Sequence, residues 1–137
     1  IKHGSLGDIT FALDAMFAIR KKYLNSLIYL LTEKKYISFL TKTKIFDKII
    51  VDNRKIFLFI SFLNLLNLLK ENFDIVIDLQ NSQRTLLYNL IIRLFNKSLI
   101  CSSRPFAHLR YKIPIQGQES ARIGLSNQLK NLILKID

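Results

Sequence analysis

The chain has 137 residues, a length typical of one domain, and half of its residues are hydrophobic, which excludes a disordered protein. A formal net charge of +11 predicts attraction to polyanions: a nucleic acid, an anionic membrane or a phosphorylated small molecule. Cys101 is the one cysteine of the sequence, which excludes an internal disulfide and fits a reducing compartment.

The first residues predict the end of a β-strand, then a glycine loop, then a helix. Residues 1–3 are fewer than a typical strand needs, so we expect the first strand to be cut short in this chain. Gly4 and Gly7 permit a sharp turn and a close approach of a ligand to the backbone. Apolar residues then recur at the spacing of one helix face: Ile9, Ala12, Leu13, Met16 and Ile19.

Asp8 is the acid of this loop and has two possible roles. A helix N-terminus directs free N–H groups at whatever lies over the loop and favours an anionic ligand. The local sequence alone favours Asp8 as a cap of the helix. The alternative is a general base that acts on a hydroxyl group while neighbouring cations hold an anionic substrate.

The rest of the chain alternates between buried strands and amphipathic helices. Strands are predicted at residues 26–31, 48–51, 74–79 and 98–102. Helices are predicted at residues 33–40, 56–71, 82–95 and 119–136, with a loop at 103–118. This alternation predicts one α/β domain, built on a parallel sheet with helices on both faces.

The carboxyl ends of the strands form the predicted binding edge, because ligands of open parallel sheets bind there. Gln80, Asn81 and Arg84 follow the fourth strand, and Arg104 follows the fifth. No acid occurs between residues 79 and 118, whereas six cations do: Arg84, Arg93, Lys97, Arg104, Arg110 and Lys112. We therefore expect this edge to bind anionic groups.

Several chemistries are excluded by missing motifs. The glycines complete neither a P-loop nor a dinucleotide-binding fingerprint. Two histidines, one cysteine and no Asp-x-Asp pair predict that the chain has no metal site. The aromatic residues lie within apolar segments, so a nucleic acid is not an expected partner. The apolar run at residues 56–69 is too short to span a bilayer; it is expected to be a helix packed on the sheet, with an added contact to a membrane surface or a second domain as the alternative.

Two blocks of the chain resemble the family 9 glycosyltransferases, the lipopolysaccharide heptosyltransferases. The first is Gly4-Ser5-Leu6-Gly7-Asp8-Ile9, followed by Ala12, Leu13 and Ala15. The second is residues 73–80, Phe-Asp-Ile-Val-Ile-Asp-Leu-Gln, followed by Arg84. The first helix departs from the family at Asp14, where a proline is common.

This resemblance implies a Rossmann-like fold, the N-terminal half of a GT-B enzyme. Residues 1–137 would form the acceptor-binding domain, and the nucleotide-sugar domain would lie outside this chain. The implied reaction is an inverting, metal-independent and cofactor-free transfer of a heptose-type sugar from an ADP-sugar to the lipid A–inner core acceptor. It would take place in the cytoplasm, with peripheral contact to the inner membrane.

The resemblance also implies roles for individual residues. Asp8 corresponds to the family's proposed base. The residues expected to bind substrate are Gly4, Ser5, Leu6, Gly7, Gln80, Asn81, Arg84 and Arg104. For Asp78 two roles stay open, which are fixing the loop after the fourth strand and contacting the substrate.

Two other functions remain open from the sequence. The first is a flavodoxin-like or receiver-like signalling module, although receivers gather several acids at this edge and only Asp8 and Asp52 are candidates here. The second is a basic nucleic-acid-binding domain, for which the chain contains no recognised motif.

Overall fold

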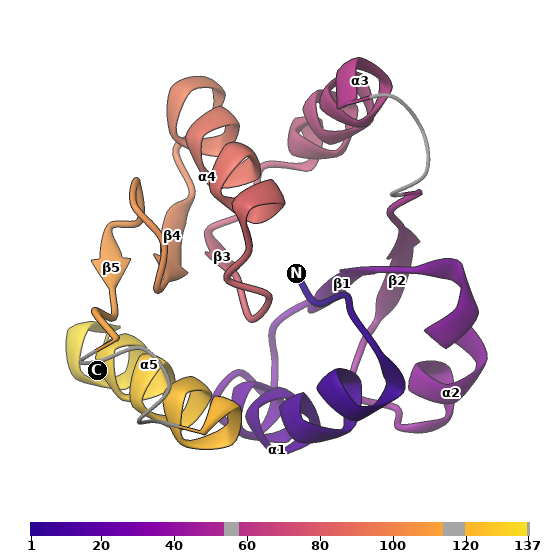
Figure 1. Cartoon of the computed structure of the whole chain (residues 1–137), viewed down its shortest axis with the longest axis vertical. Helices are drawn as coiled ribbons and strands as arrows, with labels where there is room; N and C mark the ends of the chain where they lie inside the picture. The colour runs from indigo at the N-terminus through magenta and orange to yellow at the C-terminus, as the bar shows by residue number, and fades with distance from the viewer. Residues whose placement is uncertain (54–57, 114–119, 137) are drawn as a thin grey trace.

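The computed structural model describes residues 1–53, 58–113 and 120–136 and has an α/β architecture (Figure 1). Its helices are α1 (Leu6–Lys22), α2 (Ile37–Lys42), α3 (Leu58–Leu68), α4 (Gln83–Phe95) and α5 (Ala121–Ile136). Its strands are β1 (Tyr29–Thr32), β2 (Lys48–Val51), β3 (Ile75–Ile77), β4 (Leu99–Ser102) and β5 (Leu109–Arg110). Single 3-10 turns precede α2, at Lys34–Tyr36, and follow α3, at Leu69–Glu71.

The strands form two small parallel sheets, and the first residues of the chain lie between them. β1 pairs with β2, while β4 pairs with both β3 and β5. The Ile1 ammonium donates to the carbonyl of Ile77 at 2.7 Å, and Leu79 N–H donates back to Ile1 at 3.0 Å. On the other side, Lys2 N–H donates to the carbonyl of Leu31 at 3.1 Å. The order in space is therefore β2, β1, residues 1–3, β3, β4 and β5.

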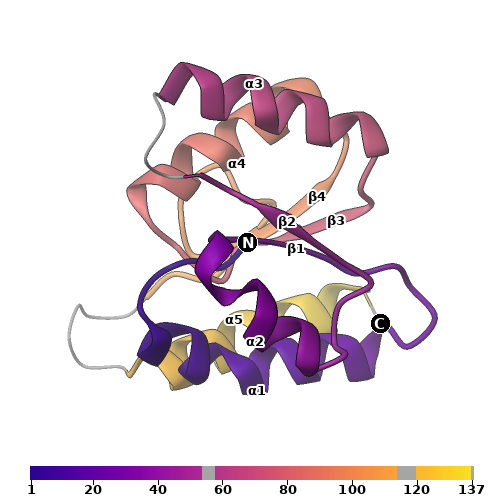
Figure 2. The same ribbon diagram turned by 90° about the vertical axis from the view of Figure 1, so that its right-hand side faces the viewer.

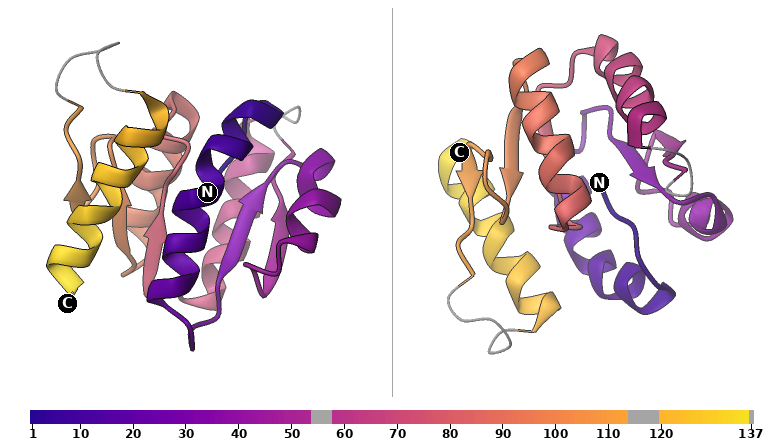
Figure 3. Two further views of the ribbon diagram at one scale, coloured as in Figure 1. Left: turned by 90° about the horizontal axis from the view of Figure 1, so that it is seen from below. Right: turned by 45° about the horizontal axis from the view of Figure 1, so that its top comes forward.

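Helices cover both faces of this arrangement. Figure 2 shows α3 and α4 on one face, with α1, α2 and α5 on the other, and Figure 3 shows α1 and α5 running beside each other. Each face has its own apolar core. Ile9, Leu40 and Leu129 belong to the core beneath α1, α2 and α5, whereas Ile92 and Ile100 belong to the core beneath α3 and α4.

The predicted alternation of strands and helices is confirmed, with differences in detail; β3, for example, is Ile75–Ile77, where residues 74–79 were predicted. Residues 103–118, predicted as a loop, contain the two-residue strand β5, which is too short to show a periodic pattern. The second predicted strand begins at Tyr29 rather than at residue 26, and the helix predicted over 33–40 is divided into a 3-10 turn and α2. Residues 1–3 have hydrogen bonds on both sides without forming a regular strand. Residues 56 and 57 of the third predicted helix, residues 114–118 of the predicted loop and residue 119 of the last predicted helix lie outside the described residues.

In the part of the chain that the structure describes, no helix combines the length and the apolar character that crossing a bilayer requires.

Candidate functional site at the carboxyl ends of the strands

The glycine loop connects residues 1–3 to α1, and its backbone requires glycine at one position. Gly4 has a φ of +108°, and a Cβ atom added there would lie 2.6 Å from Asp8 Oδ2. Two residues that follow β1 hold the loop in place: Glu33 Oε1 accepts from Gly4 N–H at 3.2 Å, and the Tyr36 hydroxyl donates to the Gly4 carbonyl at 2.7 Å. Gly7 instead lies in the first turn of α1, where an added Cβ would have only an ordinary contact.

Asp8, in the first turn of α1, forms a capping box with Ser5, the N-cap residue. Its Oδ2 accepts from Ser5 N–H at 2.8 Å and from Ser5 Oγ at 2.9 Å, and Asp8 N–H donates to Ser5 Oγ, which completes a capping box. The backbone hydrogen bond from Ser5, helped by its hydroxyl, lowers the pKa of Asp8. Both hydrogen bonds to the carboxylate use Oδ2, and no described residue donates to Oδ1. Asp8 is thus an exposed, ionised carboxylate with one oxygen available.

A cavity of about 300 Å³ opens beside this carboxylate, between α1, α5 and the loop that follows β3. Asp8 lines it together with Lys2, Gln80 and Asn81, and α5 contributes Gln128 among others. Neither Arg84 nor Arg104 is among the described residues of its lining. The structure therefore brings Asp8 together with the two amide side chains that follow β3, and it holds the two arginines elsewhere.

Asp78 orients the loop from inside the protein. Its side chain is fully buried, and Oδ1 accepts the N–H groups of Gln80 and Asn81, both at 3.0 Å. Oδ2 accepts from Asn89 Nδ2 at 3.2 Å and from Ser102 Oγ at 3.0 Å. Of the two roles that the sequence left open, the geometry favours fixing the loop.

Asn81 is held by similar contacts. It has a φ of +53°, a left-handed conformation that asparagine tolerates better than most residues. Its Oδ1 accepts from Ser102 Oγ and from Ser103 N–H, and its Nδ2 donates to Gln128 Oε1 at 2.8 Å. The Gln80 side chain is held as well, because its Oε1 accepts from His3 N–H at 3.0 Å, and both amide residues are half-buried.

Gln128 was missed by the sequence analysis. It is almost completely buried, and its Nε2 donates to the carbonyls of Asp78 and Cys101 at 2.8 and 3.3 Å. Gln128 therefore ties α5 to the ends of β3 and β4. The available signal was one amide on the otherwise apolar face that Leu125, Leu129 and Leu132 form.

Arg84 belongs to a polar cluster that is separate from the Asp8 cavity and lies on the side of the sheet that α3 and α4 cover. Its Nη2 donates to Ser61 Oγ at 2.6 Å, and its Nε donates to the Tyr88 hydroxyl at 2.7 Å. The Tyr88 hydroxyl in turn donates to Asp52 Oδ2 at 2.8 Å, and His3 Nε2 lies 2.9 Å from the same oxygen. His3, Asp52, Ser61, Arg84 and Tyr88 are called the Asp52 cluster below.

Ionisation within the Asp52 cluster is set by burial and by hydrogen bonds. Burial acts to raise the pKa of Asp52, but hydrogen bonds from His3 and Tyr88 outweigh it and lower the pKa below its ordinary value. Burial, together with the hydrogen bond to Asp52, raises the pKa of Tyr88 to about 12. Asp52 is therefore a carboxylate, and Tyr88 stays a hydrogen-bond donor, at neutral pH.

Arg104 lies at the end of β4, away from the Asp8 cavity. Its Nη2 donates to Gln83 Oε1 at 3.0 Å, and its backbone N–H donates to Ser102 Oγ at 3.1 Å. The contact with Gln83 is exposed, whereas Arg104 Nε is buried without a hydrogen-bond partner among the described residues. Arg84 and Arg104 are both half-buried.

Comparisons of the chain with protein-family models, with curated proteins and with solved structures gave no match. The described residues also contain no group of three or more histidine, cysteine, aspartate or glutamate side chains arranged to hold a metal ion. The geometry of the glycine loop, the cavity and the Asp52 cluster is therefore the basis for proposing a function.

The two glycines give a matched test of the loop. We expect Gly4→Ala to lower the free energy of unfolding by about 1–3 kcal/mol, because the positive φ and the contact with Asp8 both oppose a side chain. Gly7→Ala should instead raise it by about 0.4–1 kcal/mol, since alanine suits a helix better than glycine does. Urea unfolding of both variants measures the difference, and equal effects would contradict the loop geometry.

The lowered pKa of Asp52 predicts a pH dependence of stability. Its contribution is complete above the ordinary carboxyl pKa and is lost as the pH falls through the lower pKa of the folded state. The unfolding free energy should therefore fall as the pH drops below about 5, and less steeply in Asp52→Asn. Tyr88→Phe removes one donor, which brings the folded-state pKa of Asp52 closer to its ordinary value, so the acid-induced loss should be smaller and should end at a higher pH. A Tyr88→Phe profile identical to that of the wild type would argue against the hydrogen bond.

Proposed function

We propose that this chain is the acceptor-binding domain of an inverting, metal-independent glycosyltransferase of the lipopolysaccharide heptosyltransferase kind. The observation that carries the proposal is the exposed Asp8 carboxylate at the edge of a cavity, at the carboxyl ends of residues 1–3 and β3. A partner domain outside this chain would bind the nucleotide-sugar donor. No cofactor or metal takes part in the proposed reaction.

The strand order supports a Rossmann-like fold. If residues 1–3 count as the first strand, the order in space is 3-2-1-4-5-6 in chain order, which is that of Rossmann domains. Ligands of such domains bind where the order reverses, which here lies between residues 1–3 and β3. Flavodoxin-like and receiver-like modules have the order 2-1-3-4-5, so this geometry does not favour that alternative.

The proposed chemistry needs one base. The acceptor hydroxyl oxygen forms a bond to the anomeric carbon, while the bond from that carbon to the donor's diphosphate breaks and its electron pair leaves with the diphosphate. The proton of the hydroxyl passes to Asp8. A lowered pKa keeps Asp8 ionised and makes it a modest base, which suffices because the hydroxyl becomes acidic as the new bond forms.

Lys2 is the cation best placed to assist at this site. It lines the cavity with Asp8, and it is largely buried, which lowers its pKa, while Asp8 and Asp78 act in the opposite direction. An acidic group of the acceptor would meet Lys2 and the N–H groups at the start of α1. Arg104 would serve the same acceptor further along the edge.

A membrane contact fits the outer face of α3 and α4. Large apolar side chains are exposed there: Phe59, Ile60, Leu63, Leu87, Leu94 and Phe95. Lys70, Arg93 and Lys97 are exposed nearby, so the surface combines apolar anchors with positive charge. On this proposal the domain is cytoplasmic and touches the anionic inner leaflet, where a glycolipid acceptor is held. Nucleic acid is not a proposed partner.

Asp8→Asn tests the base. In the enzyme that joins this domain to its donor-binding domain, we expect turnover to fall by about 10²–10⁴-fold. The asparagine oxygen can still accept from Ser5, so the unfolding transition should change little. Asp14→Asn, which changes an exposed acid further along α1 that pairs with Arg122, serves as the control and should keep normal turnover. Near-normal turnover in Asp8→Asn would leave that residue with the capping role alone.

Vesicle binding tests the membrane surface. Replacing Phe59 and Leu63 by serine should weaken co-sedimentation with vesicles that contain phosphatidylglycerol by about tenfold or more, because two exposed apolar anchors are lost. The matched control replaces Phe17 and Leu24, which are as exposed but lie on and after α1. An equal loss in both double variants would indicate general stickiness rather than a surface on α3 and α4.

A further inference from the structure

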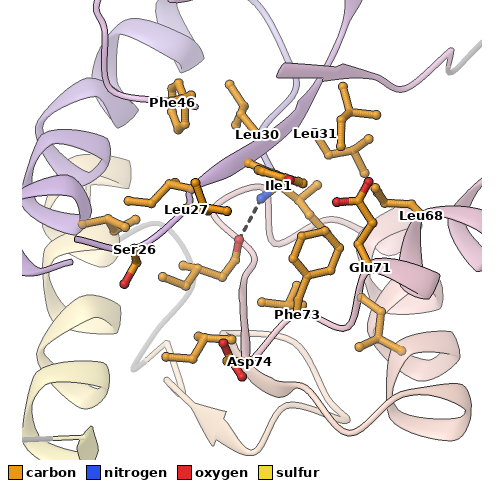
Figure 4. A pocket seen from close by; sticks show the side chains of 18 of the residues that line it. Ile1, Ser26, Leu27, Leu30, Leu31, Phe46, Leu68, Glu71, Phe73 and Asp74 are labelled. Carbon is orange, nitrogen blue, oxygen red and sulfur yellow. Dashed lines mark hydrogen bonds between the residues drawn. The ribbon is translucent and has the colours of Figure 1, made fainter. Parts of the chain in front are cut away.

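Two cavities in the part of the chain that the structure describes differ in their lining. The larger, of about 460 Å³, lies between β1 and β3 and is lined mainly by apolar side chains. Figure 4 shows Ile1 among them, with its ammonium directed at the carbonyl oxygen of Ile77. The Asp8 cavity, of about 300 Å³, is lined by polar side chains in one part and by apolar side chains in another. A ligand of the Asp8 cavity must therefore offer both a polar and an apolar surface.

Three polar groups at the Asp8 cavity have no hydrogen-bond or ion-pair partner among the described residues. They are Asp8 Oδ1, the Lys2 ammonium and Gln80 Nε2, and all three residues line the cavity. Asp8 Oδ1 can accept a hydrogen bond, while Lys2 and Gln80 can donate one. A hydroxyl group does both, and the positive charge of Lys2 offsets the negative charge of Asp8. This set of groups therefore suits a ligand portion with several hydroxyl groups.

The apolar part of the lining includes two side chains that are exposed. α1 contributes Phe11, which is 58% exposed, and the segment after β5 contributes Ile113, which is 54% exposed. Phe11 follows Asp8 by three residues, so the two side chains are neighbours on one face of α1. An exposed aromatic ring thus lies beside the ionised carboxylate, at the same cavity.

A pyranose ring has the two kinds of surface that this cavity requires. Its hydroxyl groups project from the edge of the ring, whereas its axial C–H groups form an apolar face. The face of an aromatic ring carries the negative part of its quadrupole and attracts such C–H groups. Stacking also removes apolar area of both rings from water. An aromatic side chain beside free hydrogen-bonding groups is therefore suited to holding a sugar.

We propose that Phe11 is the platform on which the sugar ring of the acceptor lies, with one hydroxyl directed at Asp8 Oδ1 and others at Lys2 and Gln80. This assignment rests on the proposed function, because it places the acceptor of the transfer in the Asp8 cavity. It makes Phe11 a substrate-binding residue that the sequence analysis did not single out. Its role is to hold the ring beside the base.

Sugar binding to this chain tests the platform. The methyl α-D-pyranosides of glucose, mannose and galactose are titrated while the backbone amide NMR signals of Asp8, Phe11 and Gln80 are followed. We expect at least one pyranoside to bind with millimolar affinity. Sorbitol, which has hydroxyl groups without a ring face, should bind more weakly. Phe11→Leu should weaken pyranoside binding about threefold to tenfold, and Phe11→Tyr should preserve it, because stacking needs an aromatic ring.

Phe17→Leu is the matched control. Phe17 lies on the same helix, is 51% exposed and is not among the described residues that line the cavity. Its replacement should leave pyranoside binding unchanged, and both leucine variants should keep the Tm of the wild type. Equal weakening by Phe11→Leu and Phe17→Leu, sorbitol binding as tight as pyranoside binding, or no shift of the cavity amides with any pyranoside would overturn the proposal. So would tighter binding of AMP with the same dependence on Phe11, since it would assign the ring to a nucleobase.

Kinetics of the enzyme that contains both domains separate Phe11 from the base. Phe11→Leu should raise the acceptor KM about threefold to tenfold and leave kcat nearly unchanged, because stacking is lost equally from the bound substrate and the transition state. An unchanged acceptor KM would count against the platform. The binding assay needs no donor, so it can fail while Asp8→Asn still lowers turnover, and it can succeed while Asp8→Asn leaves turnover normal. Failure of the platform is thus distinguishable from failure of the proposed function.

Discussion

The hydrogen bonds of residues 1–3 join the two halves of this protein. Without the contacts of Ile1 to β3 and of Lys2 to β1, the two sheets would share no main-chain hydrogen bonds among the described residues. The glycine loop and α1 follow directly, so the same contacts set where Asp8 lies relative to Gln80. The position of the candidate site is thus a consequence of sheet assembly.

Asp8 combines two demands on one carboxylate. Capping uses Oδ2 and lowers the pKa, which stabilises the helix and weakens the group as a base. Catalysis would need Oδ1, which faces no described donor. On the proposed function, one residue would serve both purposes, because the cap holds the side chain through Oδ2 and leaves Oδ1 without a described donor.

The sequence predicted the alternation of elements because buried strands and amphipathic helices have distinct periodicities. It could not predict β5, since two residues carry no period and their pairing depends on β4. It placed Arg84 correctly after the fourth strand but not its contacts, because Ser61 and Asp52 come from distant parts of the chain. The role of Gln128 was not predicted for the same reason, because its partners are carbonyl groups at the ends of β3 and β4.

Two buried carboxylates, Asp78 and Asp52, have different structural roles at the carboxyl ends of the strands. Asp78 is saturated by donors from its own loop and from α4 and β4, so it makes the floor of the Asp8 cavity rigid. Asp52 gathers His3, Tyr88 and Arg84 on the face that α3 and α4 cover. His3 belongs to the Asp52 cluster and immediately precedes Gly4, so this cluster restrains the start of the glycine loop. Glu33 and Tyr36 hold the same loop through hydrogen bonds to the Gly4 backbone. The loop that presents Asp8 is therefore preorganised from several directions, as a site that works by positioning requires.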